Sequence, residues 1–117
     1  MNPISFRIAR DEALYGTSLL KQSSLDRIWT VFPLNEGKPN PAHYGFGWGI
    51  DAVNGHKVIE HGGAWQGFAC DIARFVDDSL TVVVLTNSAN AQPGVIRQQV
   101  AGLVNPALKP PTPKQPE

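Results

Sequence analysis

The chain has 117 residues, with 10 basic and 10 acidic side chains and a formal net charge of zero. This length predicts one domain at most, with one modest hydrophobic core. A zero net charge argues against nucleic acid or an anionic membrane as a partner, because either would require a basic surface. No apolar run approaches the roughly 18 residues that a membrane-spanning helix needs, and residues 1–10 lack the apolar centre of a secretory signal.

The N-terminal half predicts two helices followed by a loop. A short helix around Leu14 is expected within residues 11–20, interrupted at Gly16, which is typical of a helix C-cap. Ser23 or Ser24 is expected to cap a second helix that runs to about Phe32, because apolar side chains follow at helical spacing. Residues 35–41 are rich in glycine and proline and predict an exposed loop.

Four segments in the middle of the chain have strand patterns. They are residues 44–53, 56–62, 67–76 and 80–87. In the first of them, aromatic and aliphatic side chains from Tyr44 to Ile50 alternate with glycines, which predicts an apolar face and a glycine face that another element approaches closely.

The connections between these strands are short. Asn54-Gly55 is a strong hairpin signal, and Asp77-Asp78-Ser79 is typical of a tight turn. The segments are therefore expected to form an antiparallel β-meander, which makes the fold class α+β.

The C-terminal part predicts a helix that begins at Pro93 and ends near Asn105, packed on one face of the sheet. The apolar stripe expected on this helix consists of Val95, Ile96, Val100, Leu103 and Val104. Residues 106–117 are rich in proline and predict a disordered tail. The predicted organisation is thus an atypical segment over 1–10, a domain over 11–105 and the tail.

His61 is the residue with the clearest chemical potential, because it lies at a strand end beside Gly62 and Gly63, where the backbone is accessible. Read alone, it is a half-buried strand histidine with a backbone partner. Trp65 either walls a pocket or stacks on the surface without function. The single cysteine, Cys70, is interpreted as a small buried apolar residue, and Asp71 is placed on the outer face.

No metal and no cofactor are expected. A zinc site would need His43, His56 and His61 together. His56 and His61 are five residues apart on one predicted strand, so their side chains point to opposite faces of the sheet.

Several motifs in order resemble the C-terminal part of the serine β-lactamase and penicillin-binding protein superfamily, in particular its class C and esterase-like branch. They are His61-Gly62-Gly63, Gly67-Phe68, the strand ending in Leu85-Thr86-Asn87, Tyr44-Gly-Phe-Gly-Trp48-Gly49, the segment from Ser24 to Thr30, and Asn35-Glu-Gly37. The resemblance covers residues 11–108 and implies part of the β-lactamase-like fold.

The resemblance implies acyl transfer by a serine, which needs a Ser-x-x-Lys helix, a Tyr-x-Asn loop and a strand of Lys-Thr-Gly type. Only the strand, which holds the carboxylate or carbonyl of the substrate, is clearly present, as His61-Gly62-Gly63. The resemblance implies that His61 donates to the substrate or to the catalytic tyrosine, that the Ala64 N–H is one oxyanion-hole donor, and that Trp65 lies beside them at the substrate-binding strand. One formal Ser-x-x-Lys exists, Ser18-Leu-Leu-Lys21, but it follows the place of the family's nucleophile and is interpreted as a chance match.

Three hypotheses follow. The first is the C-terminal part of a serine hydrolase acting on a β-lactam, peptide or ester, inactive alone. The second is half of a split hydrolase, completed by a separate N-terminal chain. Only the completed enzyme would act on an acyl substrate. The third is a non-enzymatic module that forms homo-oligomers through an uncovered sheet edge, since zero net charge gives little protection against self-association. Members of the family are usually periplasmic or secreted, and the location of this chain stays open.

Overall fold

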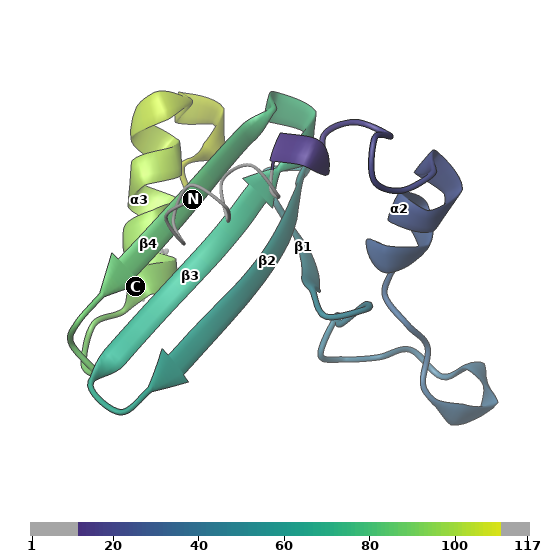
Figure 1. Cartoon of the computed structure of the whole chain (residues 1–117), viewed down its shortest axis with the longest axis horizontal. Coiled ribbons are helices and arrows are strands. Elements are labelled where there is room, and N and C mark those ends of the chain that lie inside the picture. The colour runs from purple at the N-terminus through teal and green to yellow at the C-terminus, as the bar shows by residue number, and fades with distance from the viewer. Residues whose placement is uncertain (1–11, 111–117) are drawn as a thin grey trace, which may run out of the picture.

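The computed structural model describes residues 12–110, which fold around one four-stranded antiparallel sheet whose strand order is the order of the chain (Figure 1). The strands are β1 (Gly49–Val53), β2 (His56–Trp65), β3 (Phe68–Phe75) and β4 (Leu80–Thr86). The predicted meander and the α+β class are confirmed.

The turns form where the sequence predicts them. Asn54 and Gly55 connect β1 to β2 with φ angles of 49° and 84°, the left-handed conformation that a type I′ turn requires. Between β3 and β4 lies a 3₁₀ turn, η2 (Val76–Asp78), followed by Ser79 in the left-handed region. The Asp78 Oδ2 lies 2.9 Å from the His56 Nδ1, so this turn is tied to the start of β2.

Helix α3 (Pro93–Val104) packs along β3 and β4 and closes the main core (Figure 1). The buried residues of this core are Val58, Ala73, Phe75, Val82, Ala101 and Leu108. Leu108 comes from a 3₁₀ turn, η3 (Pro106–Leu108), and is 0% exposed. The prediction of a disordered tail from residue 106 is therefore wrong for residues 106–110, because burial of Leu108 orders them; residues 111–117 lie outside the described range.

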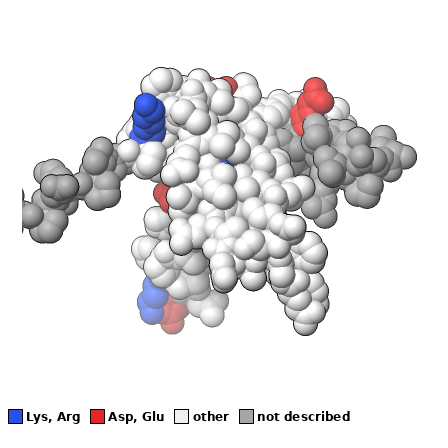
Figure 2. All heavy atoms as spheres, turned by 90° about the vertical axis from the view of Figure 1, so that its left-hand side faces the viewer, with Lys and Arg blue, Asp and Glu red and all other residues white. Residues whose placement is uncertain are grey.

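The apolar stripe predicted for α3 points away from the sheet. Its residues are all exposed, from 39% at Ile96 to 80% at Leu103. The buried residues of the helix are instead Arg97, Ala101 and Gly102. Two of these are small and allow the helix to approach its neighbours closely, which is why they face inward. In the space-filling view from this side, charged side chains are few (Figure 2).

Helix α2 (Gln22–Ile28) packs on the other face of the sheet, where Leu25, Trp29 and Ile59 form a second buried cluster. The helix is shorter than predicted, and its N-cap is Lys21, not a serine. It ends early because the backbone beyond it turns to other partners, such as the Phe32 N–H, which donates to the Tyr44 carbonyl at 2.9 Å.

The prediction of a short helix around Leu14 is only partly confirmed, since Glu12 and Ala13 are helical but Leu14 and Tyr15 lie in a turn. The predicted loop at 35–41 contains a 3₁₀ turn, η1 (Asn35–Gly37). No helix within residues 12–110 is long and apolar enough to cross a bilayer.

The strand predicted over 44–53 begins only at Gly49. Residues before it form a tight turn, in which the Gly45 N–H donates to the Trp48 carbonyl at 2.7 Å and Gly47 has a φ of 76°. The close approach expected of the glycines occurs at Gly45, where an added Cβ would lie 2.6 Å from the Ile28 carbonyl oxygen. Alternating glycines thus serve a turn here and not a flat strand face.

Candidate functional site: the open edge of β2

Strand β2 extends past the end of β1. The last pair between these strands is Gly49 with Glu60, whereas β2 continues to Trp65. Figure 1 shows β2 and β3 running on together beyond β1. Over residues 61–65, β2 therefore pairs with β3 on one side only, and within residues 12–110 no strand covers its other side. All five residues are exposed.

The backbone groups that point to this open edge follow from the strand register. Two-residue hairpins close on a pair that exchanges both hydrogen bonds, and such pairs alternate along antiparallel strands. Val53 with His56 closes the first hairpin, and Trp65 with Phe68 closes the second. Even-numbered residues of β2 therefore present their N–H and C=O groups to the side of β1. Beyond β1, these are the groups of Gly62 and Ala64.

His61 lies where the open edge begins, and its ring is hydrogen-bonded to Tyr44. Its Nε2 lies 2.9 Å from the Tyr44 Oη, and the two rings are tilted with centroids 6.1 Å apart. His61 is exposed. The expectation of a half-buried histidine with a backbone partner is wrong, because the tight turn before β1 carries Tyr44 to the end of that strand, next to Gly49.

The two glycines of the edge differ in the room around them. An added Cβ on Gly63 would lie 2.9 Å from the Cys70 Sγ, whereas on Gly62 the nearest atoms would be 3.8 Å away. Cys70 is half-buried and fills the space beside Gly63, which agrees in part with its interpretation as a small core residue. A side chain at position 63 would therefore collide with Cys70 on β3, whereas a Cβ at position 62 would be in ordinary van der Waals contact.

An exposed apolar surface adjoins the open edge on the face of His61. Trp65, 77% exposed, is the last residue of β2, which continues beyond the end at residue 62 that the sequence predicts. It lies directly across from Phe68. The same face continues along β4 through the exposed side chains of Val83 and Leu85, which pair with Ile72 and Cys70.

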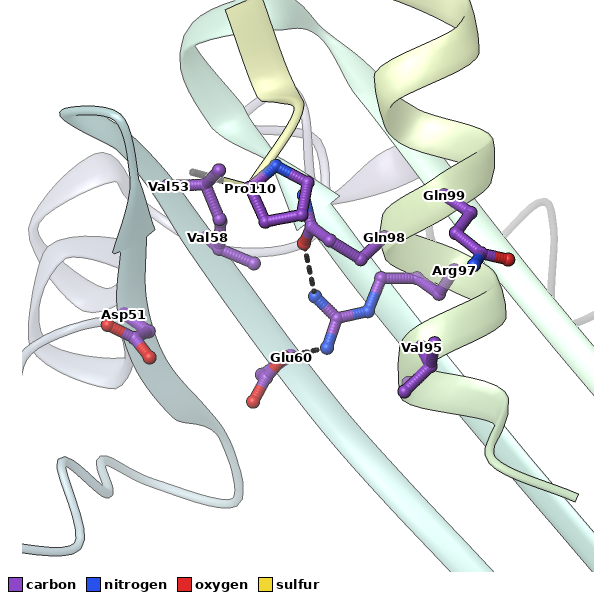
Figure 3. A pocket seen from close by; sticks show the side chains of 10 residues that line it. Asp51, Val53, Val58, Glu60, Val95, Arg97, Gln98, Gln99 and Pro110 are labelled. Carbon is purple, nitrogen blue, oxygen red and sulfur yellow. Dashed lines mark hydrogen bonds and ion pairs between the residues drawn. The ribbon is translucent and has the colours of Figure 1, made fainter. Parts of the chain in front are cut away.

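A pocket of about 430 Å³ lies on the other face, between β1, β2 and α3 (Figure 3). Arg97 reaches into it from α3; its Nη2 is ion-paired with Glu60, and its Nε donates to the Asp71 Oδ1 at 3.0 Å. Asp71 is only 10% exposed, so its placement on the outer face is wrong. Strand alternation with Ala73 and Phe75 could have found this, because both of those residues face α3.

The formal Ser-x-x-Lys does not lie on a helix. Ser18 is in an exposed bend, and Lys21 has extended backbone angles ahead of α2. The two residues are therefore not on successive turns of one helix, the arrangement that would bring the amine beside the hydroxyl.

Within residues 12–110, no group of three His, Cys, Asp or Glu side chains could hold a metal ion. His56 is paired with Asp78 at one end of β2, and His61 contacts Tyr44 further along the strand.

Comparison with known proteins finds partial similarity to two kinds of protein. The chain is 28% identical over 78 residues to a penicillin-binding protein of Bacillus subtilis, and these residues are 66% of this chain and 17% of that protein. It is 32% identical over 71 residues to a D-aminopeptidase of Brucella ovis and to that of Brucella melitensis, which is 60% of this chain and 14% of each enzyme. No protein-family model matches the chain, and no solved structure matches it significantly.

Proposed function

We propose that this chain supplies the substrate-binding strand of a serine hydrolase that transfers acyl groups. The observation that carries the proposal is the open edge of β2, where no strand within residues 12–110 pairs with the outward backbone groups of Gly62 and Ala64, beside His61. The partial similarity to a penicillin-binding protein and to D-aminopeptidases supports the same chemistry. The chain spans less than a fifth of either relative, so a whole catalytic unit needs more polypeptide.

The open edge suits an extended acyl substrate. A peptide that lies along a free strand edge gains main-chain hydrogen bonds, here with Gly62 and Ala64. In this proposal, the Ala64 N–H also donates to the oxygen that becomes negative when the acyl carbonyl is attacked.

The substrate class follows from the names of the relatives. One binds penicillin and the other is a peptidase for D-amino acids, so we propose a β-lactam or a peptide with a D-residue, and an ester as the simpler alternative. His61 would contact the carboxylate or carbonyl of that substrate, with Gly63 and Trp65 beside it.

The nucleophile in this proposal lies outside residues 12–110. Ser18 and Lys21 lack the helical arrangement that the reaction needs. The serine, its lysine and a tyrosine would come from a longer form of this chain or from a separate N-terminal chain, and the protein described here would be inactive alone. In either case the missing part would pack against the apolar surface of Trp65, Phe68, Val83 and Leu85.

Two measurements on the 117-residue protein test the proposal. The first is intact-mass spectrometry after incubation with a fluorescent penicillin, which should leave the protein unmodified; an adduct on Ser18 would overturn the placement of the nucleophile. The second is a titration of the isotopically labelled protein with a D-alanyl-D-alanine peptide, followed by NMR. The amide signals of Gly62 and Ala64 should shift, and those of α3 should not. Shifts confined to residues away from β2 would contradict the proposed edge.

A second candidate function is self-association. It is favoured by the exposed stripe of α3, where Ile96, Val100 and Leu103 recur at helical spacing on the surface. Two copies packed through this stripe would form a non-enzymatic dimer. Light scattering of the wild type and of a Leu103→Lys variant tests this, with Leu85→Lys on the other face as the control. A dimer lost only in Leu103→Lys supports the candidate, and a wild-type monomer at high concentration rejects it.

A further inference from the structure

We propose that Tyr44 is a positioning residue that fixes the tautomer of His61, so that His61 acts as a hydrogen-bond donor and not as a base. This inference rests on the proposed function, because it assigns a role to His61 at the acyl-binding edge. It starts from the Tyr44 Oη, 2.9 Å from the His61 Nε2. The Tyr44-Gly-Phe-Gly motif thereby has a role at the site.

Tyr44 is held firmly from its backbone. Its carbonyl accepts from the Phe32 N–H at 2.9 Å and from the Asn40 Nδ2 at 3.4 Å, and its backbone bridges to Gly49. Gly49 is the last partner of β2 before the open edge. The phenol thus lies at the end of β1, beside His61.

The direction of the hydrogen bond decides the chemistry of His61. A phenol O–H is a better donor than the N–H of a neutral imidazole, and an unprotonated ring nitrogen is a good acceptor. When Tyr44 donates, Nε2 is unprotonated. The proton of the neutral ring then resides on Nδ1, because the hydrogen bond made by one ring nitrogen determines whether the other carries the proton. Within residues 12–110, the His61 Nδ1 has no hydrogen-bond partner. This nitrogen is then a neutral donor for an oxygen of the substrate.

The opposite direction would give a different site. If the His61 Nε2–H donated to the Tyr44 oxygen, Nδ1 would carry a lone pair and could accept a proton from a nucleophile or a water molecule. An acyl-binding strand needs donors for substrate oxygens, as the backbone of Ala64 provides. The hydrogen bond from Tyr44 therefore makes His61 a donor to the substrate, and it leaves the ring without a free lone pair that could abstract a proton.

The test is the tautomer of His61, read from long-range proton–nitrogen correlations of the imidazole rings in the labelled 117-residue protein. His61→Gln assigns the His61 signals, and His43 and His56 serve as internal references. At a pH where the ring is neutral, wild-type His61 should carry its proton on Nδ1. In Tyr44→Phe the population should shift towards the Nε2-protonated form, whereas Tyr15→Phe, which removes a hydroxyl 2.7 Å from the Thr81 Oγ1, should leave it unchanged.

Protonation of Nε2 in the wild type would overturn the inference even if Tyr44→Phe did not fold. An unchanged tautomer in a folded Tyr44→Phe protein would overturn it as well. Neither result depends on catalysis or on ligand binding. Failure of the peptide titration with the expected tautomer would reject the proposed function alone.

Discussion

The Arg97 Nε donates to the Asp71 Oδ1 at 3.0 Å, with both side chains only 10% exposed. The same guanidinium is ion-paired with Glu60 on β2, so one residue of α3 joins the helix to two strands. Glu60 directly precedes His61, and Asp71 pairs with Gly62 across the sheet. The helix is thus anchored directly behind the start of the open edge.

Replacement of Arg97 by alanine should destabilise the protein by about 3 kcal/mol or more, because it leaves the buried Asp71 carboxylate, and the half-buried Glu60 carboxylate on the neighbouring strand, without their partner. Urea unfolding monitored by circular dichroism measures the change. The control is Lys38→Ala, which removes an exposed ion pair with Glu36 and should cost less than about 1 kcal/mol. Equal losses in the two variants would contradict the structural role of Arg97.

Gly45→Ala should destabilise the protein by about 2 kcal/mol or more, because the added methyl group meets backbone oxygens that cannot move away easily. The carbonyl oxygens of Ile28 and Thr30 would lie 2.6 and 2.8 Å from it. Gly16→Ala is the matched control, since no atom lies within 4 Å of its added Cβ, and it should change stability by no more than about 0.5 kcal/mol. Thermal unfolding of both variants tests this pair.

Leu108→Ala should cost about 2 to 5 kcal/mol, the range for emptying a buried leucine site, because Leu108 is 0% exposed. Leu103→Ala, five residues earlier and 80% exposed, should change stability by less than about 0.5 kcal/mol. Chemical denaturation distinguishes the two. A small effect at Leu108 would mean that the chain after α3 contributes little to the core.

Proline substitutions on β2 should separate the two edges of the strand. Ala64→Pro removes an N–H that points to the open edge, and proline is accepted where the N–H faces solvent. Gly63→Pro removes an N–H that points to β3 and also places a Cβ 2.9 Å from the Cys70 Sγ. It should cost at least about 2 kcal/mol more than Ala64→Pro, and more than Gly63→Ala, which has the same Cβ contact but keeps the N–H, since a ladder bond is lost and its acceptor is left unpaired. Thermal unfolding ranks the three variants. A greater loss of stability in Ala64→Pro would contradict the assignment of the Ala64 N–H to the open edge and of the Gly63 N–H to β3.

The meander could be predicted from local signals. Asn54-Gly55 and Asp77-Asp78-Ser79 fix the turns through their own backbone preferences, and the runs between them are of strand type. Helix α3 was also predicted with nearly its observed bounds, because Pro93 marks its start. These features depend on residues close together in the sequence.

The predictions that were wrong concern features that depend on contacts between residues far apart in the sequence. The apolar stripe of α3 was assigned to the sheet, yet Ala101 and Gly102 face inward because small residues allow close packing against the turn of Leu108. Alternation from Tyr44 to Ile50 has a period of two, but glycine also permits the turn that forms. The contact of Tyr44 with His61 joins residues 17 apart and has no local signature. The positions of His61, Gly62 and Gly63 on a strand were predicted, whereas the open edge required the observed register.

The central claim is that β2 has an open edge at Gly62 and Ala64, and amide hydrogen exchange followed by NMR tests it most directly. In the 117-residue protein, the amides of Gly62 and Ala64 should exchange rapidly, while those of His61 and Gly63, which point to β3, should be protected. Protection that alternates in this way would establish the edge as available to a substrate. Protection of Gly62 and Ala64 equal to that of Gly63 would show that the edge is covered and would contradict the account.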